Sequence, residues 1–105
     1  MSNNNYVSQM INLIIDELPD IPLELASLYA LLALTRGINT TLEDVHDAWA
    51  VWTAATRNKL DHPSLIPFKE LTTEIQELDR EYMNGIHRAA QREIKYQEAA
   101  TKRVL

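Results

Sequence analysis

Two tryptophans and two histidines are the residues best suited to a binding site in this 105-residue chain. Trp49 follows His46 by three residues, and Trp52 follows Trp49 by three, so the three rings share one side of a helix. A second histidine, His62, follows in a proline-bearing segment. Indole rings suit both a protein core and a pocket that stacks a flat ring. The simpler interpretation is that both tryptophans fill the core, and the functional one is that at least one lines a cleft.

The cover of such a cleft would be the segment 58–71, in which Pro63 and Pro67 break the helical periodicity. A loop of this length in a small domain is usually packed down and often functional. We expect His46 to form a hydrogen bond to this loop. Guanidinium groups bind phosphate through paired donors. Basic residues border the loop or follow it: Arg57, Lys59, Lys69, Arg80 and Arg88.

Other kinds of chemistry find little support in the composition. The absence of cysteine excludes thiolate zinc sites, disulfides and cysteine nucleophiles. The two glycines, Gly37 and Gly85, cannot form a glycine-rich phosphate loop. No two histidines stand four residues apart, and Ser64 lies outside any nucleophile-elbow motif. We therefore expect no metal, no cofactor and no enzymatic activity, although a triad assembled only in space is not excluded.

The hydrophobic periodicity predicts an all-α domain with four helices and a proline-containing ordered loop between the third and the fourth. The chain has the length of a single domain, 1–105. It divides into an N-terminal helical pair at 4–36, a core at about 42–90 and a basic helix end at 91–105. The first helix is expected at 4–18, the second from about 20 to 36, the third from about 40 to 58 and the fourth from about 72 onward.

Local signals predict where these helices begin and end. Pro19 ends the first helix, Pro22 fits the first turn of the second, and Gly37 ends the second by adopting a left-handed conformation. Two capping boxes are expected, Thr40–Glu43 for the third helix and Thr73–Gln76 for the fourth. The second helix is apolar almost all round, which predicts a homodimer or a higher homo-oligomer.

The charge is negative overall but unevenly distributed. The net charge is −5, and the sequence pI is about 5.1. Residues 80–105 nevertheless carry six bases against three acids. This acidic balance disfavours nucleic-acid binding. The absence of a long apolar run or a secretory leader leads us to expect a cytoplasmic protein with no membrane partner.

Three stretches resemble the ryanodine-receptor repeat domain over about residues 42–90. They are Val45–Trp49 (VHDAW), the loop 62–71 (HPSLIPFKEL) and Leu78–Arg80 (LDR). This module occurs in the animal calcium channel and in small bacterial and phage proteins. The present chain has one copy rather than a tandem, and its first 40 residues have no counterpart in the repeat. The resemblance places these positions around a pocket: His46, Trp49, Trp52, His62, Pro67, Phe68, Asp79 and Arg80.

The resemblance implies a ligand-binding module for a nucleotide-derived signal of the ADP-ribose or cyclic-nucleotide type. In such a pocket, aromatic faces would stack on a base and Asp79 would accept hydrogen bonds from ribose hydroxyls. A small phage protein of this design would act as a counter-defence sponge in the host cytoplasm, holding the signal without converting it. The alternatives are a helical protein-interaction module with no small ligand, and a hydrolase acting on the same signal.

Overall fold

The computed structural model describes residues 5–56 and 60–104, and every regular element in these ranges is helical. Four long helices, one short helix and two 3-10 turns make up this part of the chain, which contains no strand. The elements are α1 (Tyr6–Glu17), α2 (Leu23–Thr35), η1 (Gly37–Asn39), α3 (Leu42–Thr56), η2 (Phe68–Glu70), α4 (Thr73–Glu77) and α5 (Arg80–Val104). The predicted all-α class with four principal helices is confirmed.

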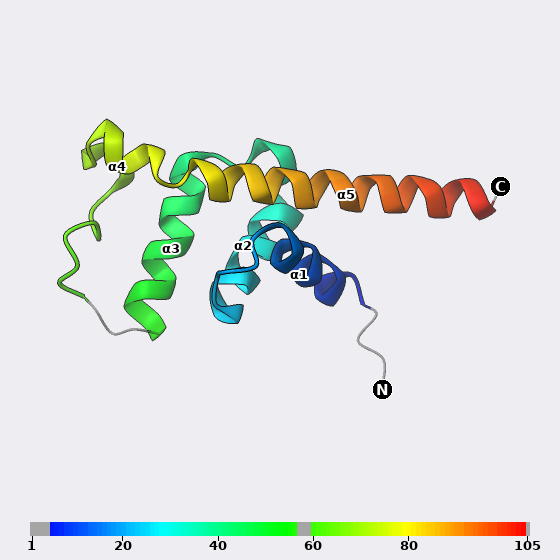
Figure 1. The fold of residues 1–105 in the computed structure, drawn as a ribbon, viewed down its shortest axis with the longest axis horizontal. Coiled ribbons are helices and arrows are strands. Elements are labelled where there is room, and N and C mark those ends of the chain that lie inside the picture. Colours follow the sequence, from blue (N-terminus) through cyan, green and yellow to red (C-terminus); the bar gives the residue numbers. More distant parts are fainter. Residues whose placement is uncertain (1–4, 57–59, 105) are drawn as a thin grey trace.

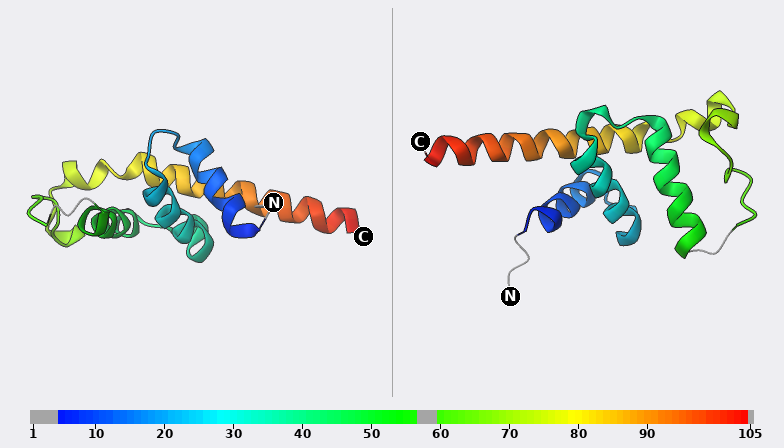
Figure 2. Two further views of the ribbon diagram at one scale, coloured as in Figure 1. Left: turned by 90° about the horizontal axis from the view of Figure 1, so that it is seen from below. Right: turned by 180° about the vertical axis from the view of Figure 1, so that it is seen from behind.

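Helix α5 is the longest element and runs along a molecule with principal extents of 53 × 31 × 20 Å (Figure 1). Helices α1 and α2 pack against each other and against α5, and α3 packs against both α2 and α5. The C-terminal part of α5 extends beyond α1 in every view (Figure 2). The segment that follows α3 returns to it through η2 and α4, both of which contact α3. This return places the loop beside the face of α3 that carries the tryptophans.

The hydrophobic core forms where one face of each long helix meets the others. Ile14, Val45 and Ile86, from α1, α3 and α5, have no exposed surface. The three- and four-residue spacings predicted these buried faces, whereas Tyr6 and Val7 at the start of α1 are exposed. The buried apolar residues are Met10, Leu13, Ile14, Leu18, Leu25, Ala26, Tyr29, Ala30, Ala33, Val45, Trp52, Ile86, Ala89 and Ala90.

The capping box of α3 lies one residue later than predicted. The backbone N–H of Asp44 donates to the Thr41 hydroxyl at 3.1 Å, and the Asp44 carboxylate accepts from the Thr41 backbone N–H at 2.9 Å. Thr40 instead donates from its hydroxyl to the Gly37 carbonyl at 2.8 Å. Gly37 has φ = +58°, the left-handed conformation expected at the end of α2. Pro22 is the N-cap of α2 rather than a residue of its first turn.

The predicted fourth helix is split in two. Thr72 caps α4 by accepting from the Ile75 backbone N–H at 3.3 Å. The predicted partner in the capping box, Gln76, donates instead to the carbonyls of Phe68 and Leu71 and so ties α4 to η2. The N–H groups of residues 78 and 79 bond to carbonyls three residues earlier, which tightens the chain before α5 begins. Periodicity alone does not reveal this break, because the apolar pattern continues through it.

Two arginines of α5 hold the C-terminal end of α1. Arg88 donates to Glu17 at 2.7 Å, and Arg92 donates to the same carboxylate at 3.1 Å. The hydrogen bond from Arg88 and then that from Arg92 lower the pKa of Glu17 below its usual 4.5. The folded state therefore favours the carboxylate more than the unfolded chain does. This stabilisation is present above the usual pKa and is lost as the pH falls through the lowered one.

We expect Glu17→Gln to lower the free energy of unfolding by about 1 kcal/mol at neutral pH, because both arginines are partly exposed. The variant should also lose less stability than the wild type between about pH 5 and pH 3. Urea denaturation across this pH range measures both effects. Glu74→Gln, which neutralises an exposed acid of α4, is the control and should keep the wild-type dependence. If the free energies of unfolding of E17Q and the wild type fell equally as the pH is lowered, the ion pairs of Glu17 would not be the source of the pH dependence.

Candidate functional site

A cavity of about 540 Å³ lies among the start of α2, the middle of α3, the loop, and the junction of α4 and α5. Its volume is within the range of small-molecule sites. Apolar and aromatic side chains form much of its wall, together with acids, histidines and a serine. The lining residues are Asp20, Ile21, Pro22, Leu25, Tyr29, His46, Trp49, Trp52, His62, Ser64, Ile75, Leu78, Asp79, Glu81 and Tyr82.

The aromatic wall is built mainly by α3 and the loop. The Trp49 ring lies 5.7 Å from the His46 ring, measured between centroids, and 5.1 Å from the His62 ring, which it meets edge to face. Trp52 is buried at the base of the same wall, whereas Trp49 is half-buried. Trp52 therefore belongs to both the core and the cavity lining. The core and cleft interpretations of the two tryptophans are thus compatible.

Two histidines fix the loop against α3. Nε2 of His46 donates to the carbonyl oxygen of Ile66 at 2.8 Å, since a carbonyl can only accept, and this is the bond expected between His46 and the loop. Nδ1 of His62 accepts from the backbone N–H of Ser64 at 3.0 Å, within a turn closed by the N–H of Leu65 on the His62 carbonyl. Both rings are therefore held in one orientation before any ligand enters.

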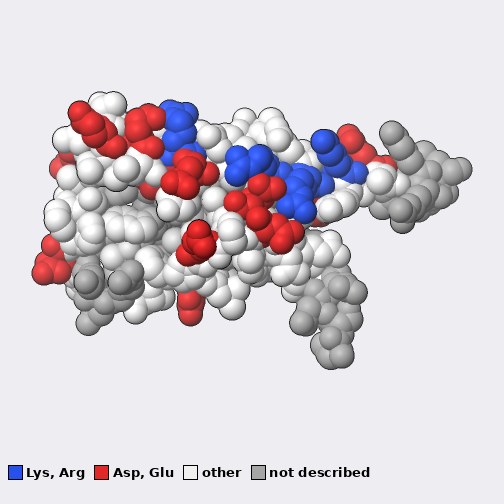
Figure 3. Space-filling model, viewed as in Figure 1, with Lys and Arg blue, Asp and Glu red and all other residues white. Residues whose placement is uncertain are grey.

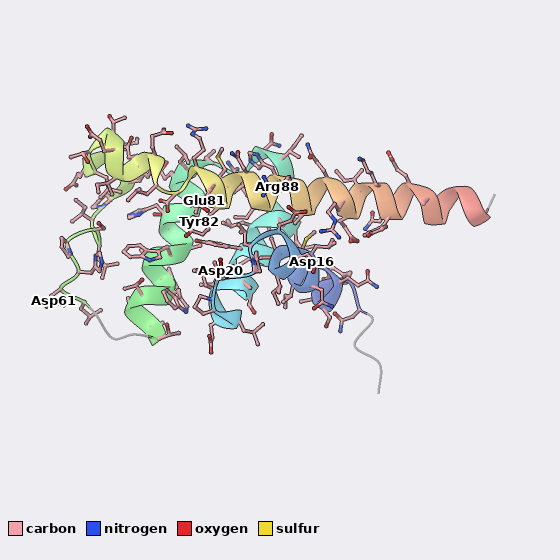
Figure 4. All side chains as sticks on the ribbon, viewed as in Figure 1. Asp16, Asp20, Asp61, Glu81, Tyr82 and Arg88 are labelled. Atoms are coloured by element: carbon pink, nitrogen blue, oxygen red, sulfur yellow. The ribbon has the colours of Figure 1, made fainter. Side chains whose placement is uncertain are left out.

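The opposite wall carries carboxylates and tyrosines. Tyr82, from the first turns of α5, and Asp20, from the turn before α2, lie between the ribbons of α2 and α3 (Figure 4). The Tyr82 ring packs 6.2 Å from that of Tyr29. Asp79 is half-buried, and desolvation raises the pKa of its carboxyl group. Burial, and then the charge of Asp79, raise the pKa of the Tyr29 hydroxyl.

The structure brings half of the predicted site residues to this cavity. His46, Trp49, Trp52, His62 and Asp79 line it. Pro67, Phe68, Lys69 and Arg80 do not, and Arg57 lies outside the described residues.

Each of the four absent residues has another place in the structure. Phe68 packs against His46, with 6.1 Å between ring centroids, and so lies behind the wall. Pro67 and Lys69 are exposed around η2. Arg80 is exposed and forms a two-pronged ion pair with Glu77 at 2.6 and 3.1 Å. Asp79 lies in the turn before α5 and Arg80 is the first residue of that helix, and only the side chain of Asp79 lines the cavity.

Several lining residues are not predictable from the sequence, above all Tyr29, Tyr82, Asp20 and Glu81. No local motif marks them, because three separate segments carry them to the cavity. The charge of the lining also differs from expectation. It includes three carboxylates and, among the described residues, no lysine or arginine. On the face shown in Figure 3, the basic side chains lie over α5.

A second cavity of about 480 Å³ lies between α1 and α5 and is lined by Gln9, Asn12, Leu13, Glu93, Tyr96 and Gln97. The Gln97 amide donates to the buried Glu93 carboxylate at 3.2 Å. In the described part of the chain, no group of three or more histidines and acids is placed to hold a metal ion. None of its helices is long and apolar enough to cross a membrane.

The fold and the cavity define a small all-helical domain with an aromatic, acid-bearing cavity beside a proline-containing loop. The chain belongs to the family described as Domain of unknown function (DUF7701), whose model matches residues 5–91. The match includes every residue that lines the cavity and ends within α5. No curated protein and no solved structure matches the chain. The family description gives no function, so the resemblance to the ryanodine-receptor repeat stays a prediction.

Proposed function

We propose that this protein binds and sequesters a small nucleotide-derived molecule, of the ADP-ribose or cyclic-nucleotide type, without converting it. The observation that supports the proposal most is the aromatic wall, in which the rings of His46, Trp49 and His62 are fixed around one cavity. Stacking on such rings contributes about 1–3 kcal/mol per base in other nucleotide-binding proteins. In the proposed role, the protein acts as a phage counter-defence sponge in the host cytoplasm.

The chemistry of the lining favours the nucleoside part of the ligand as the part that enters. The Asp79 carboxylate and the Tyr29 hydroxyl can bond to ribose hydroxyls or to amino groups of a base. Phosphates would meet the half-buried Asp79 inside the cavity and the exposed carboxylates of Asp20 and Glu81 at its rim, and like charges repel. The proposed pose therefore keeps the phosphates outside the cavity, in solvent.

Calorimetric titration with adenosine, ADP-ribose and cyclic ADP-ribose tests the proposal. A sponge should bind at least one of them with a stoichiometry near one and should release it intact when the protein is denatured by heat. Accumulation of a cleaved product would show a hydrolase instead. Neither heat nor a thermal shift with any of these ligands at millimolar concentration would overturn the proposal.

The exposed side of α2 supports a second candidate, a protein-interaction surface. Four apolar residues form a solvent-facing stripe along α2 and η1: Leu23, Leu31, Leu34 and Ile38. The side chains of such a stripe gain free energy when they are removed from water. We propose that a second copy of the chain covers it, giving a homodimer. A two-fold pairing would place the stripe of each copy against that of the other, as a self-complementary interface requires.

Leu31→Glu tests this surface, because residue 31 is 55% exposed and the change should leave the folded protomer intact. We expect the variant to dimerise at least about tenfold more weakly than the wild type, since a carboxylate would be buried at the centre of the contact. Light scattering across a concentration series measures the change. Val51→Glu alters an equally exposed residue of α3 and should have no effect. A wild type that stays monomeric at high micromolar concentration would exclude the dimer.

A further inference from the structure

We infer that the cavity selects a positively charged aromatic ring, of the pyridinium or N-alkylated purine class, as the part of the ligand that it encloses. The inference rests on the proposed function and narrows it from a nucleotide-derived molecule to one whose ring carries a cation. It differs from what the sequence predicts, since lysines and arginines around the pocket favoured an anion. The reasons lie in the charge, the unpaired polar groups and the rings of the lining.

The charge of the lining is one-sided. Three carboxylates line the cavity: that of Asp79, which is half-buried, and those of Asp20 and Glu81, which are exposed. The described lining residues include no lysine or arginine, and their basic side chains are the imidazoles of His46 and His62. Arg80, the basic residue next to Asp79, is instead paired with Glu77. A cationic group in the cavity would therefore meet favourable charges, and a phosphate would not.

Two polar groups of the lining have no hydrogen-bond partner within the described structure. The Tyr29 residue is only 2% exposed, and its hydroxyl forms no hydrogen bond there but opens onto the cavity, since the one described side-chain polar atom that is sealed off without a partner belongs to Thr53. The half-buried Asp79 carboxylate likewise accepts no hydrogen bond, although the charge of a protonated His46 ring acts on it and lowers its pKa, against the larger effect of burial. Buried polar groups are nearly always paired, and a desolvated carboxylate is stabilised by an opposite charge. A ligand that brings a cation to Asp79 and a polar substituent to Tyr29 would satisfy both.

The rings of the lining favour the same ligand. Trp49, Trp52, Tyr29 and Tyr82 all contribute to the wall. The faces of indole and phenol rings carry negative electrostatic potential, so they attract a cation as well as stacking on a flat ring. An aromatic cation gains from both effects, whereas a neutral ring gains only from stacking. A cationic ring should therefore bind more tightly than a neutral ring of the same shape, because only the cation is attracted by both the indole faces and the Asp79 carboxylate.

The probes 1-methylnicotinamide and nicotinamide test this discrimination, because they share one ring and differ by a methyl group and a positive charge. We expect the wild-type protein to bind the cation at least about tenfold more tightly in calorimetry. Raising the salt concentration should weaken binding of the cation and leave that of nicotinamide unchanged. Asp79→Asn should remove most of the preference by weakening the cation alone. Asp47→Asn removes an equal charge from the exposed side of α3 and should preserve the preference.

Equal affinity of the wild type for the two probes, or tighter binding of nicotinamide, would overturn the inference. The comparison of the two probes uses only the wild-type protein, so it tests the inference even if D79N folds poorly. Should adenosine or ADP-ribose bind while the charged probe shows no preference, the inference fails and the proposed function survives. Should no nucleoside derivative and neither probe bind, both fail.

Discussion

Gly85→Val is expected to lower the free energy of unfolding by about 2–3 kcal/mol, because α5 and the end of α1 leave no room for a side chain at this position. A Cβ atom built on Gly85 would lie 2.7 Å from both Cγ and Cδ2 of Leu18. Leu18 is itself buried, so its side chain cannot move aside into solvent. Urea denaturation followed by circular dichroism measures the loss.

Two further variants separate the close contact from a general effect of valine in a helix. Asn84→Val places the same residue at the exposed neighbouring position, and its cost should stay within about 0.5 kcal/mol. Leu18→Ala removes the atoms that the new side chain would meet. In that background, Gly85→Val should cost less than about 1 kcal/mol, which a double-mutant cycle detects as coupling. Additive losses, or a G85V protein as stable as the wild type, would contradict the contact.

The role of Gly85 shows what periodicity leaves undetermined. A glycine within a helical pattern is compatible with the pattern and says nothing of what lies against it. The apolar spacings do predict which faces of α1, α3 and α5 are buried, because each face is a local property. The approach of α5 to Leu18 depends on how two helices cross, and 66 residues separate the two positions. Such close approaches become visible only in three dimensions.

The candidate site likewise has one part that the sequence predicts and another that depends on how the helices pack. His46, Trp49 and Trp52 share one helix, so their common orientation follows from their spacing. The bond from His46 to the loop was likewise predictable, because the prolines mark a segment that must pack back on α3. The absence of the expected cations from the lining was not predictable, because Arg80 directly follows Asp79 and yet pairs with Glu77. Asp20 and Tyr82 reach the cavity only through the packing of α2 and α5 on α3.

The proposed ligand should bind about 10- to 100-fold more weakly to Trp49→Ala than to the wild type, the effect of losing one stacking surface. Trp49 is the suitable target because it is half-buried and lines the cavity, whereas Trp52 is part of the core. Calorimetry with the tightest-binding nucleoside derivative measures the change. A thermal melt of the same sample verifies that the helical fold persists.

Matched variants assign the loss to the ring rather than to a disturbed helix. Trp49→Phe retains an aromatic face and should recover most of the affinity, whereas a purely structural role would be met equally well by Trp49→Leu. Val51→Ala removes an exposed apolar side chain from α3, outside the cavity, and should bind like the wild type. If W49A and W49L kept full affinity, the stacking wall would not hold the ligand. The carboxylates and tyrosines across the cavity would then have to account for binding alone.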